Sequence, residues 1–260
     1  MTRINRDVNP LTVLHFGGNG HSAIRLDRAR EALGRLCPTL TLVDLPYSGF
    51  EGRLGRTTFE AFLDDLAAIV RTVPVPPAAA YASGIGALIA LGLRARGELA
   101  GVPLIFQGPV LWGLEDRWFP RVFRRFPPLR GLLRSAFGRS RFQARFARKQ
   151  FVRRHDPEFL EGFFRGYRDC SSFGDFFDWL TPAWLRTLET VFHDHPARLG
   201  LIEVWVGGLD HVVGLAEVRR TERTLGVSWP VVEFATWGHY PMIDVPEEWA
   251  HALCRTLAPA

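Results

Sequence analysis

The strongest constraint on the fold of this chain is an alternation of short apolar runs with amphipathic segments. Most of the apolar runs are rich in Val, Leu, Ile or Phe and lead into Gly or Asp, as buried strands do. The amphipathic segments carry apolar residues at three- and four-residue spacing, which is typical of helices. Strands that alternate with helices predict a mainly parallel sheet with helices on both faces. The expected strands are 11–16, 40–43, 78–82, 102–107, 201–206 and 229–234, and the expected helices are 27–36, 59–70, 86–96 and 246–257.

The alternation stops between residues 113 and 195. This stretch is rich in Phe, Arg and Trp, has the character of several helices, and lies between the fourth and fifth expected strands. We therefore expect an α/β core made of residues 1–112 and 196–260, with a helical cap at 113–195 inserted over one end of the sheet. A chain of 260 residues is long enough for one such core with an insertion.

The overall composition, with 47% hydrophobic and 23% charged residues, is that of a globular protein. The polar first residues lack the apolar stretch of a secretory signal, and no apolar run approaches the roughly 18 residues of a membrane span. The three cysteines, Cys37, Cys170 and Cys254, fit neither a disulfide framework nor a metal site, so we expect thiols in a reducing cytoplasm. His193 and His195 lack the partners of a metal cluster, and no metal or cofactor is expected.

Three motifs at the ends of expected strands carry possible chemistry. They are VLHFGGNG at 13–20, YASGIGALIAL at 81–91, and a final pair, VGGLDHVV at 206–213 with WGHYPMIDVPEEWAHAL at 237–253. In this order they resemble the α/β-hydrolase family over nearly the whole chain apart from the insertion. The resemblance implies an α/β-hydrolase fold, with a nucleophile elbow after a central strand and an acid and a histidine after later strands.

In the elbow motif the family pattern of small residues around the nucleophile fits only one register. It makes Ala82, Gly86 and Ala87 the small residues and puts Gly84 in the nucleophile position. A register with Ser83 as nucleophile would place bulky residues where the strand and helix backbones must come close. Glycine reaches positive φ with little strain, so it would preserve the turn without the reactive side chain. The alternative is a plain strand–glycine–helix turn without a site.

The other motifs supply the remaining members of a hydrolase site. Asp210 stands where the family keeps its acid, and His239 stands where it keeps its general base. Gly17 and Gly18 are the candidates for an oxyanion loop, together with the N–H of Ile85, although Phe16 occupies a position that is usually glycine. His15, beside this loop, is expected to be buried and hydrogen-bonded, and His21 is a candidate for the pocket mouth.

The insertion is strongly basic. Residues 117–154 hold thirteen Arg or Lys and no Asp or Glu, so the rest of the chain carries a net charge of −8 (5 − 13). Four interpretations stay open: a solvated cap face with its Phe side chains packed inward, a site for an anionic substrate group or an acyl-carrier phosphopantetheine, contact with anionic lipid, and, least favoured because no binding module is present, nucleic acid. The Phe-rich stretches 159–169 and 173–180 either line an apolar pocket or only pack the cap.

A glycine at the nucleophile position excludes the acyl-enzyme route of serine hydrolases, and the aspartate of the dehalogenase and epoxide hydrolase branches is absent as well. The sequence predicts an enzyme in which His239 and Asp210 perform acid–base chemistry (hydrolysis, elimination or cyclisation) on a mostly apolar small or acyl substrate. Two alternatives remain: Ser83 as a displaced nucleophile, and a catalytically inactive protein that docks an acyl carrier or an anionic surface through its cap.

Overall fold

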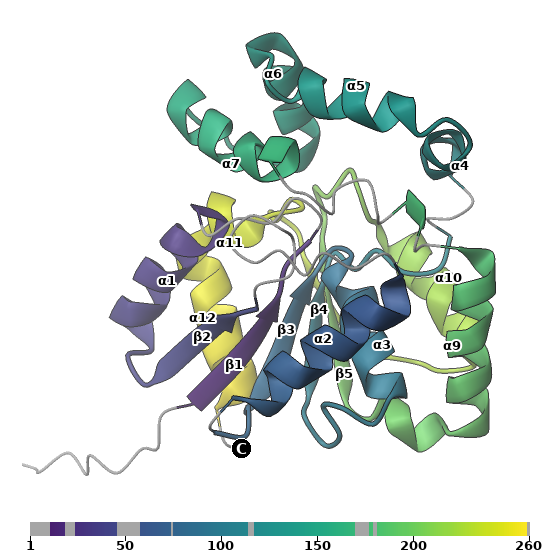
Figure 1. Ribbon diagram of the computed structural model, residues 1–260. Coiled ribbons are helices and arrows are strands. Elements are labelled where there is room, and N and C mark those ends of the chain that lie inside the picture. Colours follow the sequence, from purple (N-terminus) through teal and green to yellow (C-terminus); the bar gives the residue numbers. More distant parts are fainter. Residues whose placement is uncertain are drawn as a thin grey trace, which may run out of the picture.

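The centre of the molecule is a six-stranded sheet in which every neighbouring pair of strands is parallel (Figure 1). The computed structural model describes residues 11–18, 24–45, 58–73, 75–113, 117–169, 177–178 and 181–258. The strand order is β2-β1-β3-β4-β5-β6, which confirms the predicted mainly parallel sheet. The strands are β1 (Leu11–Phe16), β2 (Leu40–Asp44), β3 (Ala79–Ser83), β4 (Leu104–Gln107), β5 (Ile202–Gly207) and β6 (Val231–Phe234).

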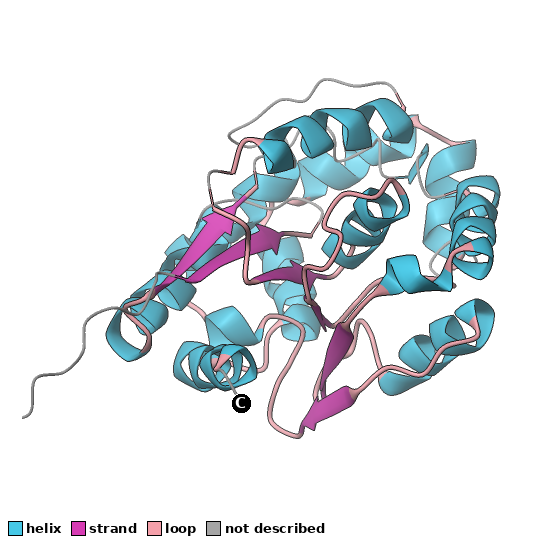
Figure 2. Cartoon of the chain, turned by 90° about the horizontal axis from the view of Figure 1, so that it is seen from below, coloured by secondary structure: helices cyan, strands magenta, loops and turns pink. Residues whose placement is uncertain are grey.

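Helices cover both faces of this sheet (Figures 1 and 2). One face packs against α1 (Ile24–Leu36), the short α11 (Pro241–Asp244) and α12 (Pro246–Leu257). The opposite face packs against α2 (Phe59–Arg71), α3 (Gly86–Ala95), α9 (Pro182–Asp194) and α10 (Leu215–Leu225). A short 3-10 helix, η1 (Pro196–Leu199), leads from α9 into β5.

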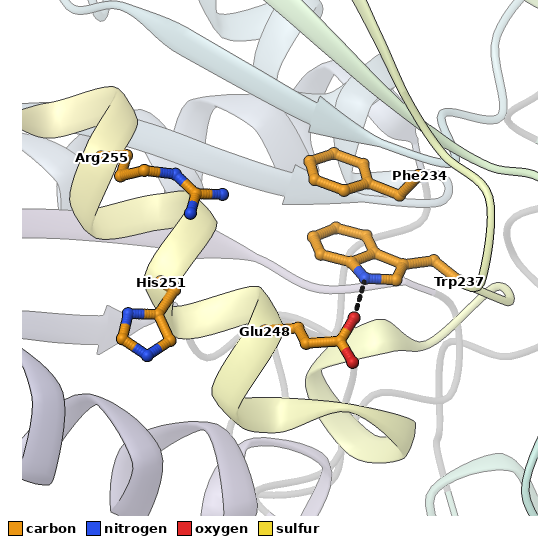
Figure 3. Close-up of a pocket in the computed structure, with 5 residues that line it drawn as sticks. All are labelled: Phe234, Trp237, Glu248, His251 and Arg255. Atoms are coloured by element: carbon orange, nitrogen blue, oxygen red, sulfur yellow. Dashed lines mark hydrogen bonds between the residues drawn. The ribbon is translucent and has the colours of Figure 1, made fainter.

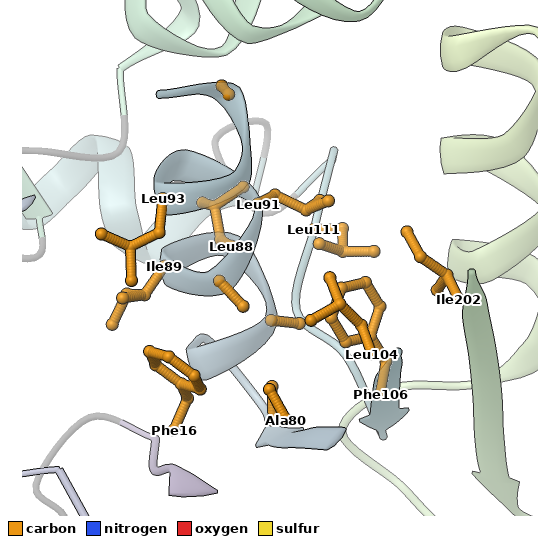
Figure 4. Close-up of a cluster of buried hydrophobic side chains, with 14 of the residues drawn as sticks. Phe16, Ala80, Leu88, Ile89, Leu91, Leu93, Leu104, Phe106, Leu111 and Ile202 are labelled. Carbon is orange, nitrogen blue, oxygen red and sulfur yellow. The ribbon is translucent and has the colours of Figure 1, made fainter. Parts of the chain in front are cut away.

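The two cores follow from the period of two along each strand, which sends successive side chains to opposite faces. On β3, Ala80 and Ala82 belong to the core under α3, whereas Ala79 and Tyr81 belong to the core under α12. Figure 4 shows the first of these cores, with Phe16, Leu104 and Phe106 gathered beneath α3. Every residue of α3 is buried, which explains why its sequence, GALIALGLRA, is apolar almost all round.

Among the described residues, the cap consists of four helices inserted between β4 and β5. They are α4 (Trp118–Arg125), α5 (Pro128–Ala136), α6 (Ser140–Gln150) and α7 (Pro157–Asp169), and they lie beyond the carboxyl ends of the strands (Figure 1). Helix α9 differs from them: although the predicted insertion extended to residue 195, α9 packs against α3 and α10 of the core. Its buried Leu185, Leu188 and Phe192 provide the apolar stripe for that contact. Among the described helices, none is both long and apolar enough to cross a membrane.

Helices α1 and α12 are joined by a disulfide between Cys37 and Cys254. Their Cα atoms are 6.5 Å apart, within the range that a disulfide spans. The prediction that these two cysteines are thiols is wrong, because it rested on spacing along the chain. Packing of α1 on α12 brings together two cysteines 217 residues apart. Cys170 lies outside the described residues.

The most demanding backbone contact lies where α3 begins. A Cβ built on Gly86 would overlap the carbonyl of Phe16 at the end of β1, and only backbone atoms stand in its way. Gly34, on the solvent side of α1, has no heavy atom within 4 Å of its Cβ position. The two glycines therefore form a matched pair for substitution.

We predict that Gly86→Ala lowers the free energy of unfolding by about 2–3 kcal/mol, because strand and helix must separate to admit the methyl group. Gly34→Ala should raise it by about 0.5–1 kcal/mol, since alanine loses less backbone entropy in a helix. Denaturant titration of the two variants measures both changes. Equal effects would contradict the close contact at Gly86.

Candidate active site

The turn between β3 and α3 has the backbone of a nucleophile elbow. Gly84 follows the last strand residue at a φ of +55°, a conformation that glycine adopts without strain. The turn is fixed by two hydrogen bonds: the Gly84 N–H donates to the carbonyl of Gln107 (3.2 Å), and its carbonyl accepts from the N–H of Val110 (2.9 Å). The sequence at this position therefore suits the backbone that it must adopt.

Asp210 and His239 meet beside this turn, although 29 residues separate them. Asp210 follows a turn after β5, and His239 lies in the loop between β6 and α11. The Nδ1 of His239 donates to Oδ2 of Asp210 at 2.9 Å. The other oxygen of Asp210 accepts the backbone N–H groups of Val212 (2.7 Å) and Val213 (3.0 Å). The carboxylate is therefore held on both sides, and the imidazole tautomer is fixed with Nε2 unprotonated in the neutral ring.

The hydrogen bonds decide the charge of Asp210. Burial alone would raise the pKa of this carboxyl group, but the charge and hydrogen bond of His239 and the N–H groups of Val213 and Val212 outweigh burial. The net effect is a pKa below the usual value for aspartate. Asp210 therefore stays ionised over the whole neutral range and can stabilise an imidazolium on His239.

The free edge of the imidazole faces the elbow. A Cβ placed on Gly84 would lie 3.8 Å from Nε2 of His239, at an ordinary van der Waals distance. A hydroxyl one bond further out could reach hydrogen-bonding distance, roughly 2.6–3.2 Å, from this nitrogen. The residue that the sequence register assigned to the nucleophile position thus stands opposite the histidine, without a side chain.

Two residues that the sequence motifs did not indicate support the pair. Gly108, directly after β4, has a φ of +47°, and a Cβ there would lie 2.8 Å from Oδ2 of Asp210 and 3.1 Å from Nδ1 of His239. A side chain at position 108 would therefore crowd the hydrogen bond itself. The buried Gln107 donates from Nε2 to the carbonyl of His239 at 3.0 Å and so holds the histidine backbone. Gln107 ends β4 and Gly108 follows it, and the sequence of this short strand showed only its apolar character, without a motif that would indicate a site.

The predicted oxyanion residues also lie at the elbow. Gly17 follows β1, and its carbonyl oxygen lies 2.9 Å from the position that a Cβ of Gly86 would take. A Cβ on Gly18 would lie 3.7 Å from the carbonyl oxygen of Ser83. Ile85 is the N-cap residue directly before α3, at the end of a helix where N–H groups lack acceptors within the helix. Their part in binding an oxyanion stays a prediction. Ser83 is buried as the last residue of β3, and within the described residues no hydrogen bond joins it to His239.

Two further histidine–aspartate pairs lie nearby. His15 binds Oδ1 of Asp44 on the neighbouring strand at 2.9 Å and is 1% exposed, as predicted for a buried and hydrogen-bonded residue. His155, which no motif indicated, binds Oδ1 of Asp244 on α11 at 2.9 Å. Asp244 also accepts the N–H of Val152 at 2.8 Å, so this buried carboxylate ties the loop between α6 and α7 to the core. His21 lies outside the described residues.

The inner side of the cap is aromatic. Phe163 and Tyr167 of α7 are buried against Arg25 of α1, whose guanidinium carbon lies 4.2 and 4.7 Å from the two ring centroids. The hydroxyl of Tyr240, the residue after His239, lies 3.2 Å from that of Tyr167 and accepts from Arg25 at 3.5 Å. These rings pack the cap onto the core directly beside the histidine. Of the second Phe-rich stretch, only Phe177 and Asp178 lie within the described residues.

Two surface pockets lie away from this pair. The pocket in Figure 3 has a volume of about 340 Å³ and lies between the end of β6 and α12, and the other, of about 310 Å³, lies between β2 and α2. Neither is lined by His239 or Gly84, and His239 itself is only 6% exposed. The pocket of Figure 3 is formed by Phe234, Trp237, Glu248, His251 and Arg255.

We predict that Asp210→Asn lowers the free energy of unfolding by about 1–3 kcal/mol at neutral pH, because His239 loses a charged acceptor. The pKa of Asp210 is lowered in the folded state, so its contribution is present above the unfolded-state value near 4 and disappears as the pH falls through the folded-state value. The difference between wild type and variant should therefore shrink on acidification. Denaturant titrations between neutral and strongly acidic pH measure it, and a constant difference would contradict the assignment.

We predict that Gly108→Ala breaks the pair without removing either partner. The added methyl group would lie closer to the Asp210 carboxylate than van der Waals contact allows. The imidazole nitrogen shifts of His239 in an NMR spectrum should change from one fixed tautomer towards a mixture. Gly226→Ala is the matched control, because Gly226 also has a positive φ, +67°, and has no atom within 4 Å of its Cβ position. A His239 signal that changes equally in both variants would refute the role of Gly108.

Comparisons with known proteins agree with this architecture. A family model described as "Alpha/beta hydrolase family" matches residues 13–252. Among solved structures, the haloalkane dehalogenase DbeA from Bradyrhizobium elkani superposes with a TM-score of 0.71 at 18% identity, covering 97% of this chain and 91% of that one. A membrane phospholipase A, titled a bacterial virulence factor, superposes with a TM-score of 0.63 at 18% identity, covering 98% and 81%. The search of curated proteins gave no match.

At these identities the solved structures establish the fold alone, whereas the family model spans most of the chain. The helical insert α4–α7 corresponds to the cap of the dehalogenase structures. The parallel sheet, its helices on both faces and the inserted cap are the fold that the sequence motifs predicted. The chain belongs to the α/β-hydrolase family.

Proposed function

We propose that this protein is an enzyme that works without an elbow nucleophile, through acid–base chemistry of His239 and Asp210. The observation that carries the proposal is the direction of the imidazole: Nδ1 is bound to a buried carboxylate, and Nε2 faces the vacant side-chain position of Gly84. A substrate atom or a water molecule in that position would lie next to an unprotonated nitrogen. The support is geometric, since Gly108 leaves the space in which the two side chains meet.

The proposed step is a proton transfer. Nε2 of His239 takes a proton from water or from the substrate, and the imidazolium is stabilised by ionised Asp210 until the proton passes to the leaving group. Negative charge that develops on the substrate would be met by the N–H groups of Gly17, Gly18 and Ile85. Hydrolysis by water, elimination and cyclisation all fit this scheme. Displacement of a halide by a carboxylate does not, because Gly84 has no carboxylate to form the intermediate.

The substrate that we propose is small or acyl and mostly apolar, bound under the cap. The aromatic residues of α7 that reach the loop of His239 support this choice. An alternative is a protein without catalysis that binds a ligand or a partner through its cap. The low exposure of His239 favours this second function.

We predict that His239→Ala lowers turnover about a hundredfold to ten-thousandfold on any substrate found in a panel of short and long acyl esters and lactones. Asp210→Asn should lower it as well, because the wrong tautomer then faces the substrate. The exposed His251 on α12 provides the control, since His251→Ala should leave turnover unchanged. Full activity of His239→Ala would contradict an acid–base role, and binding of a ligand without turnover would support the alternative.

We predict that Gly84→Ser creates esterase activity that is absent from the wild type, because the new hydroxyl would stand within reach of Nε2. Gly84→Ala is the matched control: it carries the same backbone strain, about 1–3 kcal/mol, without a hydroxyl. The gain should disappear in Gly84→Ser combined with His239→Ala. Esterase activity already present in the wild type, and unchanged by Gly84→Ala, would show that the proposed mechanism is wrong.

A further inference from the structure

The outer part of the cap presents large apolar side chains to solvent. Helices α4 and α5 follow one another, joined at Phe126 and Pro127, in the layer above the carboxyl ends of the strands (Figure 1), and we call this pair of helices the α4–α5 hairpin for its short connection only. Along this hairpin, Trp118 is 73% exposed, Phe126 54%, Leu132 61% and Leu129 36%. Among the described residues, nine large apolar side chains are exposed, and these four lie within one short stretch of the chain. A cluster of large apolar side chains that is exposed to solvent is typical of a binding surface.

The stretch of the cap from α4 to α6 carries uncompensated positive charge. No acidic residue occurs between positions 117 and 154, which hold thirteen basic ones. Some of these arginines are bound inward: Arg130 forms a bidentate pair with Asp178 (2.6 and 2.7 Å), and Arg134 donates to the carbonyl of Arg168 (2.8 Å). Arg125 at the end of α4 is exposed instead, as are Arg139 and Arg141 at the start of α6, and within the described part of the chain none of the three forms an ion pair. The stretch from α4 to α6 therefore combines exposed apolar side chains with exposed cations.

We propose that the α4–α5 hairpin docks the protein on the surface of a bilayer that contains anionic lipid. Trp118, Phe126 and Leu132 would enter the boundary between headgroups and acyl chains, while the exposed arginines contact lipid phosphates. Trp and Phe with Arg are the residues that interfacial helices use for these two tasks. Binding of this kind needs no membrane-spanning helix.

A lipid surface fits this face better than an acidic protein does. Large exposed side chains of both kinds, apolar and cationic, suit the boundary of an anionic bilayer, which meets acyl chains and phosphates at once. The net charge of opposite sign on the rest of the chain, −8, orients the molecule with the cap towards the anionic surface. The proposal does not depend on the chemistry proposed for His239.

The test is co-sedimentation of the full chain with vesicles. Vesicles of equimolar phosphatidylcholine and phosphatidylglycerol should bind the protein at low salt, and vesicles of phosphatidylcholine alone should bind it much less, because the arginines then have no net charge to meet. Added salt should weaken binding to the anionic vesicles. Absence of binding to the anionic vesicles at low salt, or equal binding to both kinds, overturns the proposal.

Matched variants locate the surface. Trp118→Ala with Leu132→Ala should weaken binding about tenfold or more, because apolar area no longer enters the bilayer. Leu201→Ala is the control, since Leu201 is 74% exposed at the start of β5, away from the cap. Arg125→Gln on α4 and Arg141→Gln on the adjoining α6 should each weaken binding about fivefold. The control Arg223→Gln, on α10, should leave binding unchanged. If the cap variants bind vesicles as the wild type does, or lose only binding to an acidic acyl carrier protein, the hairpin is not a lipid-docking surface.

Discussion

The structure depends on one close approach of backbones, at the start of α3. Here the backbone at the end of β1 lies so close to Gly86 that no side chain fits between them. Two residues earlier, Gly84 at positive φ turns the chain from strand into helix. The contact lets α3 lie directly over the middle of the sheet, where all of its residues are buried. It also brings the loop after β1 beside the turn. The geometry that a hydrolase site requires is therefore also a requirement of the core.

The His239–Asp210 pair depends on a second set of constraints, which come from β4 and β5. Gly108 leaves the space in which the two side chains meet, and Gln107 holds the histidine backbone. Asp210 is oriented by two backbone N–H groups of its own loop. The ends of β4, β5 and β6 thus converge on one hydrogen bond, as expected where the carboxyl ends of parallel strands meet at one edge of a sheet. A pair supported from so many sides is well ordered before any ligand arrives.

Sequence patterns predicted most of this arrangement, and the reasons for their success and failure are physical. Patterns of period two and of period 3.6 are local, so the strands and helices of the core could be read from them. The motifs at strand ends named Gly84, Asp210 and His239, which the structure brings together, and their roles stay predictions. Gly108 and the His155–Asp244 pair were missed because their importance comes from contacts across the fold. The disulfide of Cys37 was missed for the same reason. Helix α9 has an apolar stripe that fits either the cap or the core, and only the tertiary contacts with α3 and α10 decide between them.

Glycine at position 84 separates two requirements that a serine at an elbow meets together. One is the backbone turn, which glycine satisfies with less strain than any other residue. The other is a reactive side chain, which glycine lacks. A protein that had lost all use for the site would have no need of a buried aspartate whose charge is maintained against burial, or of a glycine that makes room for its histidine. The buried pair instead keeps an imidazole nitrogen next to an open position, which favours chemistry on a group that the ligand itself brings there.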